Sequence, residues 1–312
     1  MDLASFLIKL ERLNVSRSTG KPAPHKAVLL LSVIQGFESK QITTNKIFIT
    51  PELVATFKDK FYSWVRDTRF QPNFSLPFYH LKSEGFWHLQ LLSGKEMPLT
   101  SSGSIRSFTA LRETIAYTYL SEDVYLLLQD PAVRDQTKHI LIKTYLGGQY
   151  LQTSDSSTLR DIEQQILHEP AVAYRLEAAA ADEEEQFLRN SVFKKIIPRT
   201  YNYTCCISGM QIIASGVQMI DACHIIPFAL SHDDTISNGL SLCPNLHRAF
   251  DRFLITIDET YKVIVSPHFK EAGPYPIHVF HGQPILLPGE QEYFPAIENL
   301  RWHNEKYYLL NK

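Results

Sequence analysis

The chain has 312 residues, of which 44% are hydrophobic and 21% are charged, enough to bury the cores of two ordinary domains. No stretch approaches the roughly 18 to 20 consecutive apolar residues of a membrane helix, which excludes a membrane-spanning protein. The first segment, "MDLASFLIKLERLNVS", carries charges within its apolar run, unlike a secretory signal, so we expect a cytoplasmic protein. The net charge of −2 is compatible with nucleic-acid binding if basic side chains gather on one face.

The first part of the chain is predicted to be mostly helical, with some strand. A buried helix begins at Pro24 and ends near Gly36, because the residues between them form a nearly continuous apolar run. In the next helical segment, Phe57, Phe61 and Trp64 recur at helical spacing, and we expect them in the core.

Six aromatic residues then crowd the segment "FQPNFSLPFYHLKSEGFWHLQLL", which ends in a predicted strand, "FWHLQLL". Two more helices are predicted after it. One covers about 107–120, and the other follows Asp130, which is an N-cap residue placed directly before Pro131.

The charge pattern changes sign in the middle of the chain. Residues 177–185, "EAAAADEEE", contain five acidic residues and no basic one, and their composition favours an exposed helical connector. Residues 186–203 carry only basic charges, and their apolar residues predict an amphipathic helix that stops at Pro198. The cations of this helix either form a solvated face or contact phosphates. The candidates for such contacts are Arg189, Lys194, Lys195 and Arg199.

The segment "IDACHIIPFALSHDDTISNGLSLCPNLHRAFD" holds the residues with the clearest chemistry. It predicts a strand that ends near His224, a loop with Asn238, a short strand "LSLC", and a helix that carries His247. One imidazole at a strand end can take a proton from water, while a second imidazole and a carboxylate can hold a divalent cation. An asparagine in the loop can bond to the backbone and hold the strand pair in register. The arrangement suits metal-assisted hydrolysis of a phosphodiester.

These motifs carry a resemblance. The region from 205 to 257 is similar to the HNH nuclease module, the ββα-metal fold, in the version with "AxHIIP", "NGLxL" and "HRxFD" that occurs in bacterial HNH restriction endonucleases. Asn238 follows His224 by 14 residues and His247 follows Asn238 by nine, and the similarity extends over about 186–303. The resemblance implies that His224 is the general base, that Asn238 organises the loop, and that His247 binds Mg²⁺ or Mn²⁺.

The carboxylate that completes the metal site is less directly indicated. Many members of the family have the metal-binding acid immediately before the first histidine, where this chain has Cys223. We expect Asp221 to serve instead, although positions 221 and 224 face opposite sides of a regular strand, so a bulge or an irregular strand end is required. Asp251 and Asp233 are the substitutes.

All cysteines lie in the C-terminal part of the chain, and none belongs to a CxxC pair. This pattern favours buried thiols over a structural zinc site or a disulfide framework. The cysteines are Cys205, Cys206, Cys223 and Cys243.

The N-terminal pattern "PAPHKAVLLL…LPFYHLKSEGFWHL" resembles the N-terminal domains of HNH restriction endonucleases and, more loosely, the sulfur-binding domains that recognise phosphorothioate-modified DNA. The resemblance implies an apolar pocket with a positive rim, which favours sulfur over the smaller and better hydrated oxygen. Structural roles for the same residues, or a pocket for a flipped 5-methylcytosine or hydroxymethylcytosine, are the alternatives. The candidate DNA contacts are His25, Lys26, Pro77, Phe78, Tyr79 and His80.

The sequence therefore predicts an α+β protein with a mostly helical DNA-recognition domain at 1–150, a helical connector at 151–185 and a ββα-metal HNH domain at 186–312. Its expected activity is metal-dependent hydrolysis of double-stranded DNA by a modification-dependent restriction enzyme that acts against phage or other foreign DNA. The alternatives are an HNH-fold DNA-binding protein without activity and an RNA-cleaving, toxin-like nuclease. With one site per chain, cutting both strands favours a homodimer, and sequential nicking is the alternative.

Overall fold

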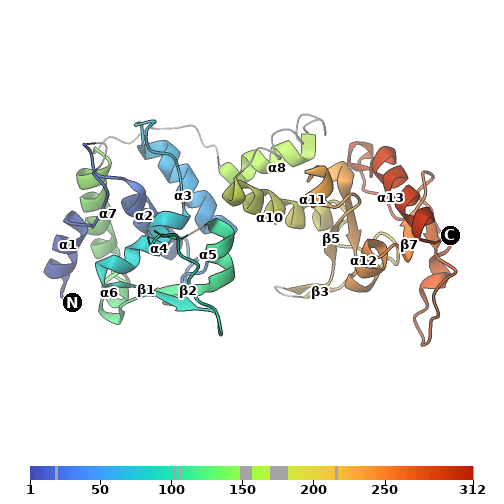
Figure 1. Ribbon diagram of the computed structural model, residues 1–312, viewed down its shortest axis with the longest axis horizontal. Coiled ribbons are helices and arrows are strands. Elements are labelled where there is room, and N and C mark those ends of the chain that lie inside the picture. The colour runs from blue at the N-terminus through green and yellow to red at the C-terminus, as the bar shows by residue number, and fades with distance from the viewer. Residues whose placement is uncertain are drawn as a thin grey trace. The chain divides into compact units, whose positions relative to one another are not determined.

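The computed structural model describes residues 1–17, 20–101, 103–105, 107–147, 157–168, 182–214 and 217–311. The chain divides into two compact units, Met1–Arg160 and Asp161–Lys312. Both units combine helices with small antiparallel sheets, which confirms the α+β class (Figure 1). Among the described helices, none is both long and apolar enough to cross a membrane. Most of the predicted connector at 151–185 lies outside the described residues.

The first unit consists of helices around a two-stranded antiparallel sheet. Its core is rich in aromatic side chains, among which Phe57, Phe74 and Phe78 are fully buried. The elements are α1 (Leu3–Glu11), α2 (His25–Glu38), α3 (Pro51–Trp64), α4 (Ser75–His80), η1 (Leu81–Glu84), β1 (Trp87–Leu91), α5 (Phe108–Thr114), β2 (Ile115–Leu120), α6 (Glu122–Leu127) and α7 (Pro131–Tyr145).

Two predicted helices of this unit are confirmed with adjusted ends. Helix α2 runs past Gly36 to Glu38, so this glycine does not end the helix. Its lack of a side chain instead permits the close approach of Ile42. A Cβ atom at Gly36 would lie 2.6 Å from Ile42 Cδ1. Helix α7 begins at Pro131, and the Asp130 side chain accepts a hydrogen bond from the Ala132 amide at 2.8 Å, as the sequence predicts.

The predicted helix over 107–120 is wrong in its second half. The chain is helical only over α5, and from Ile115 it continues as β2, which pairs antiparallel with β1. The segment "IAYTYL" consists largely of β-branched and aromatic residues, which fit a pleated surface, and β1 supplies the partner strand. Strand β1 itself confirms the predicted strand in "FWHLQLL".

The second unit holds the predicted nuclease segment. Helix α8 (Thr158–His168) includes the boundary between the units. The elements that follow it are α10 (Glu183–Thr200), β3 (Ile213–Ala214), β4 (Val217–Gln218), β5 (Asp221–His224), α11 (Phe228–Ser231), η2 (Ile236–Asn238), β6 (Gly239–Leu242), α12 (Pro244–Asp251), β7 (Ile255–Ile257), β8 (Val263–Val265), η3 (Ile277–Phe280), η4 (Gln291–Tyr293) and α13 (Ile297–Leu310). The β5–β6 pair lies between α10 and α12, and α13 packs against β7. All four cysteines are buried free thiols, as the sequence predicts.

Helix α10 packs directly on the β5–β6 pair. The prediction that Pro198 stops this helix is wrong, because α10 continues through Pro198 to Thr200. At Gly239, the first residue of β6, an added Cβ atom would collide with the Ile197 side chain of α10. The backbone at Gly239 is extended, with φ −118°, so this glycine is required for the close approach of the helix and not for a turn.

Candidate functional site

The three predicted nuclease residues lie on the elements that the sequence indicates. His224 ends β5 and pairs with Gly239 at the start of β6, in an antiparallel register without a shift. Pro244 begins α12, where its missing N–H costs no hydrogen bond, and His247 follows within the first turn. His224 and His247 line the same cavity, of about 350 Å³, together with Phe228, Phe250 and other residues. The two imidazoles therefore share one cleft.

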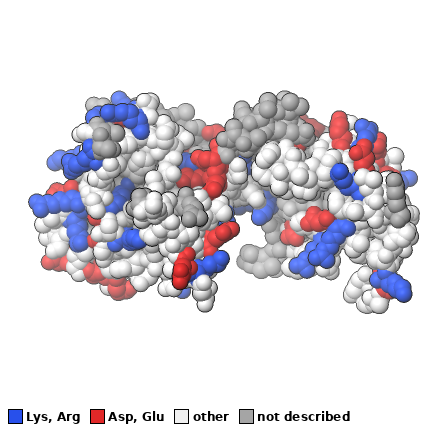
Figure 2. Space-filling view, viewed as in Figure 1, with Lys and Arg blue, Asp and Glu red and all other residues white. Residues whose placement is uncertain are grey.

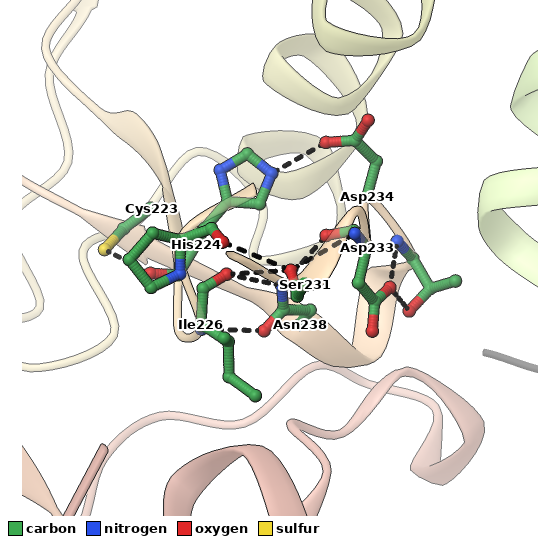
Figure 3. A network of polar contacts seen from close by, with 9 residues as sticks. Cys223, His224, Ile226, Ser231, Asp233, Asp234 and Asn238 are labelled. Carbon is green, nitrogen blue, oxygen red and sulfur yellow. Dashed lines mark hydrogen bonds and ion pairs between the residues drawn. The ribbon is translucent and has the colours of Figure 1, made fainter. Parts of the chain in front are cut away.

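Asn238 fixes the loop between the two strands. Its side chain is fully buried, and its Oδ1 accepts a hydrogen bond from the Ile226 amide at 2.9 Å. Its Nδ2 donates to the carbonyl oxygens of Ile226 and Asp233, each at 2.9 Å. The Asn238 backbone carbonyl also accepts from the Ile225 amide. This amide side chain ties the residues after His224 to the start of β6, as Figure 3 shows.

His247 lies between two carboxylates. Its Nδ1 is 3.2 Å from Asp221 Oδ2, and its Nε2 is 3.4 Å from Asp251 Oδ2. His247 and Asp251 are four residues apart on α12, so both side chains lie on one face of the helix. Asp221 reaches His247 from a regular strand, so the bulge that we expected is not needed.

A cation could be held on the Asp251 side of this histidine. Ligand atoms of Cys223, His247 and Asp251 all lie within 4.8 Å of one another, whereas Asp221 is not part of this cluster. Burial, together with the Asp251 charge, raises the pKa of the Cys223 thiol well above its ordinary value, so this thiol is neutral. An imidazole nitrogen and a carboxylate oxygen fit a divalent cation that keeps several waters, such as Mg²⁺ or Mn²⁺.

The ring of His224 is held by two further contacts that the sequence analysis missed. Phe193 of α10 stacks on it with a centroid distance of 3.9 Å and an interplanar angle of 8°. The ring Nε2 lies 2.7 Å from Oδ1 of Asp234, whose side chain is 2% exposed (Figure 3). No motif in the sequence singles out either partner, because both contacts depend on the folded loop and on the packing of α10.

His303 of α13 supports the same cavity from the other side. Its ring stacks on Phe250 with a centroid distance of 3.7 Å, and its Nε2 donates to the Phe250 carbonyl at 3.2 Å. Its Nδ1 lies 2.8 Å from the Thr256 hydroxyl. Burial lowers the pKa of His303 from 6.5 to about 4, so the ring is neutral at physiological pH.

The neutral state of His303 predicts a pH dependence of stability. Because the folded state binds this proton more weakly than the unfolded state, the contribution is complete above pH 6.5 and is lost as the pH falls to about 4. The shift corresponds to about 3 kcal/mol. In urea titrations, we expect the wild type to lose about 3 kcal/mol of its free energy of unfolding relative to His303→Gln as the pH falls from 6.5 to about 4. A difference that stays constant between pH 7 and pH 4 would contradict this assignment.

In the first unit, several of the predicted DNA-contacting residues line one cavity of about 520 Å³. His25, Lys26, Pro77 and His80 all lie on its wall. Burial lowers the pKa of both His25 and His80, and the charges of Lys26 and Lys82 add to the effect at His80. Two neutral imidazoles therefore lie beside apolar groups. Among the lining residues that sequence reasoning missed are Val15, Arg69, Phe70 and Leu76.

Lys26 contributes less positive charge to this cavity than we expected. Its side chain is 7% exposed and forms a buried ion pair with Glu84, and its Nζ also donates to Asn14 O at 2.7 Å and to Ser83 Oγ at 3.0 Å. The exposed cation at the cavity is Arg69, which is held by Asp67 through an Nε–Oδ1 contact of 2.8 Å.

Phe78 and Tyr79 are corrected to structural residues. Both are buried, at 0% and 1% exposure, and neither lines the cavity. The Phe78 carbonyl accepts a hydrogen bond from Trp87 Nε1 at 2.9 Å, and the Tyr79 hydroxyl accepts one from Lys82 Nζ at 2.5 Å. They lie in helix α4, whose apolar face turns toward the core.

The basic residues of α10 do not form one cationic face. Arg189 is corrected to a structural residue, because its side chain is 2% exposed and pairs with Glu185 at 2.9 Å. Arg199 is exposed but forms an ion pair with Glu163. Lys194 and Lys195 are exposed and stay candidates for phosphate contacts.

Two protein families match the chain. Residues 205–258 match the HNH endonuclease family, and residues 3–154 match the family of ScoMcrA-like DNA sulfur-binding domains. No curated protein matches the chain.

Three solved structures share features with the chain at low similarity. A modification-dependent TagI restriction endonuclease is 22% identical, with 36% of each chain covered and a TM-score of 0.28. The sulfur-binding domain of ScoMcrA complexed with phosphorothioated DNA is 20% identical, with 46% of this chain and 87% of that chain covered and a TM-score of 0.37. The type IV phosphorothioation-dependent restriction endonuclease ScoMcrA is 11% identical, with 97% and 99% covered and a TM-score of 0.36.

The chain thus spans only 36% of the length of the TagI endonuclease. TM-scores of 0.28 to 0.37 are too low to support a function for this chain. The evidence for a function consists of the two family matches and the geometry of the two cavities.

Proposed function

We propose that this chain, in which a ScoMcrA-like DNA sulfur-binding domain is joined to an HNH endonuclease domain, hydrolyses phosphodiester bonds in DNA that carries a phosphorothioate. It would act in the cytoplasm as a restriction enzyme against foreign DNA, and a homodimer would place two sites on the two strands. The observation that carries the proposal is the cavity shared by His224 and His247, which brings the His224 imidazole and a candidate cation site to one cleft.

In this proposal the nuclease residues have separate tasks. His224 takes a proton from the attacking water, and Asn238 holds the loop that positions this histidine. His247 and Asp251 would hold a divalent cation, which when bound stabilises the negative charge that develops on the phosphate and the leaving oxygen. Asp221 then accepts a hydrogen bond from His247 Nδ1 and orients the ring.

The proposed reader is the 520 Å³ cavity of the first unit. Leu76, Pro77 and Phe70 provide apolar surface, and burial lowers the pKa of His25 and His80 and favours neutral imidazoles, so the wall suits a weakly hydrated sulfur better than the more strongly hydrated oxygen of an ordinary phosphate. Arg69 lies at the same cavity and could contact the adjoining phosphate. On the visible face of the N-terminal unit, basic side chains gather toward the upper left and acidic ones lie mostly along the lower edge (Figure 2), and such an uneven distribution is compatible with DNA binding at a net charge of −2.

One digest panel tests the proposal. Phosphorothioated, methylated, hydroxymethylated and plain duplexes, together with total RNA, are incubated with the full chain and Mn²⁺ or Mg²⁺. We expect cleavage of the phosphorothioated duplex alone. Cleavage of a methylated or hydroxymethylated duplex alone would reassign the reader to a flipped base. Degradation of RNA alone would favour the toxin-like nuclease, and binding without any cleavage would favour an inactive DNA-binding protein.

The reader can be tested separately from cleavage. Leu76 lines the cavity and is 41% exposed, so Leu76→Ser removes apolar surface without opening the core. We expect the variant to bind phosphorothioated DNA about tenfold more weakly in fluorescence anisotropy, because about 1.4 kcal/mol of apolar contact is lost, and to bind plain DNA unchanged. Leu126→Ser is the matched control, since Leu126 is an exposed leucine of the same unit outside this cavity. An equal loss of affinity for both DNAs would argue against a sulfur pocket.

A further inference from the structure

The loop after His224 contains two adjacent buried aspartates that do different things. Asp233 is 0% exposed, and its Oδ1 accepts hydrogen bonds from the Thr235 amide at 2.9 Å and from the Thr235 hydroxyl at 2.6 Å. These contacts close the turn, so Asp233 has a structural role. Asp234 is 1% exposed and directs its Oδ1 to His224 Nε2 at 2.7 Å.

The second oxygen of Asp234 distinguishes it from a structural aspartate. Its Oδ2 is buried and has no hydrogen-bond partner among the described residues. A buried carboxylate oxygen without a partner is costly, and such atoms in a native protein call for an explanation other than stability. In Figure 3 the Asp234 side chain points at the His224 ring, away from the loop contacts that Asn238 and Asp233 form.

Together, the two contacts of His224 restrict its ring to one orientation. Phe193 stacks on the ring at 3.9 Å and fixes its plane, and the bond to Asp234 fixes the rotation within that plane. Because a carboxylate accepts hydrogen bonds, this contact favours the tautomer with the proton on Nε2, which leaves Nδ1 as the acceptor. The ring also lines the shared cavity with His247.

We propose that Asp234 is a positioning residue for the general base: it holds His224 in the Nε2–H tautomer, so that Nδ1 is the atom that accepts the proton of the attacking water. This inference rests on the proposed nuclease function. In the step, one O–H bond of water breaks, its proton passes to Nδ1, and its electron pair forms the new bond to phosphorus. The bond from phosphorus to the leaving sugar oxygen breaks, and that oxygen takes a proton from solvent. The Asp234 carboxylate stabilises the imidazolium that forms.

Asp234→Asn keeps the size of the side chain and removes its charge. We expect kcat for cleavage to fall by about 10- to 1,000-fold with KM changed less than threefold, because an amide can also donate to Nε2 and then favours the wrong tautomer. Asp234→Glu should recover part of the rate. The free energy of unfolding should change little, because the amide keeps the size of the side chain and one hydrogen bond to His224 while it removes a buried charge.

Asp233→Asn is the matched control from the neighbouring position. It removes the charge but keeps an oxygen that can accept from the Thr235 amide and hydroxyl, so we expect little change in the free energy of unfolding, in the cleavage rate or in the His224 tautomer. If Asp233→Asn and Asp234→Asn lower stability and rate in the same proportion, Asp234 is only structural and the inference is wrong.

The tautomer can be measured without any cleavage. In the full chain labelled with ¹⁵N-histidine, long-range ¹H–¹⁵N spectra should show His224 with a protonated Nε2 in the wild type and a mixture of tautomers in Asp234→Asn, with His224→Gln used to assign the signal. An unchanged Nε2–H tautomer in the variant would overturn the inference. This measurement does not depend on activity. A wild type that cleaves no DNA would contradict the proposed function, and the spectra would still test the tautomer.

Discussion

His224→Ala is expected to lower kcat for cleavage of phosphorothioated DNA by about 10²- to 10⁴-fold, the usual contribution of a general base. The physical reason is that the imidazole that lines the cavity beside His247 is removed while the candidate cation site is untouched. The measurement is a single-turnover cleavage assay with Mn²⁺, together with urea unfolding and anisotropy to show that stability and DNA affinity are retained.

His268→Ala is the control for this prediction. His268 is exposed and lies in the same unit, outside the cavity, so its replacement should leave the rate within twofold of the wild type. A His224→Ala protein that still cleaves at the wild-type rate would show that another group takes the proton.

For the cation site, the largest effect is expected from His247→Ala, which should weaken Mn²⁺ binding to the full chain by about 100-fold or more in calorimetric titrations. Asp251→Asn should cost about as much, because this carboxylate belongs to the same cluster of ligand atoms. Asp221→Asn should cost about tenfold, because Asp221 bonds to the ring of His247 from the other nitrogen and acts through it. A larger loss of Mn²⁺ affinity in Asp221→Asn than in Asp251→Asn would contradict the assignment of Asp251 as the ligand.

His278→Ala serves as the matched control for the metal titration. His278 also pairs with a carboxylate, with its Nδ1 2.8 Å from Glu271 Oε2, but it lies outside the cluster. Its replacement should leave Mn²⁺ affinity unchanged. Cleavage should fall in the same order as affinity across His247→Ala, Asp251→Asn and Asp221→Asn, and cleavage that is unaffected in a variant without measurable Mn²⁺ binding would remove the metal from the proposal.

Local sequence signals were sufficient to place the candidate nuclease residues on their elements. His224, Asn238 and His247 fall at a strand end, in a loop and on a helix, because each element is encoded by a short pattern of apolar, turn and capping residues. The burial of the cysteines also follows from their spacing, since no paired CxxC motif exists that could hold zinc.

Contacts that depend on tertiary packing could not be predicted in this way. Asp233 and Asp234 are identical in local sequence terms, and only the folded loop turns one toward Thr235 and the other toward His224. Phe193 lies on a helix that precedes the motif, so no spacing rule within the motif includes it. The sequence offers Asp251 only as a substitute for Asp221, and the geometry of α12 is needed to show that it lies beside Cys223 and His247.

Predictions from charge and composition failed where burial decided the outcome. Arg189 was predicted to be exposed because its neighbours are basic, yet its side chain is buried against Glu185. Lys26 is likewise engaged by Glu84. Residues 115–120 form a strand because β1 supplies a partner, whereas the sequence of this segment on its own also permits a helix.

The packing of α10 against the strand pair limits how small a working nuclease fragment can be. The segment that matches the HNH family, 205–258, contains neither Phe193 nor His303. A fragment of residues 205–258 would lack Phe193, which stacks on His224. It would also lack Ile197, which packs against Gly239, and would expose the backbone there. A chimaera that joins this HNH region to another DNA-recognition domain should therefore have its junction before Asp182, so that the whole of α10 is retained.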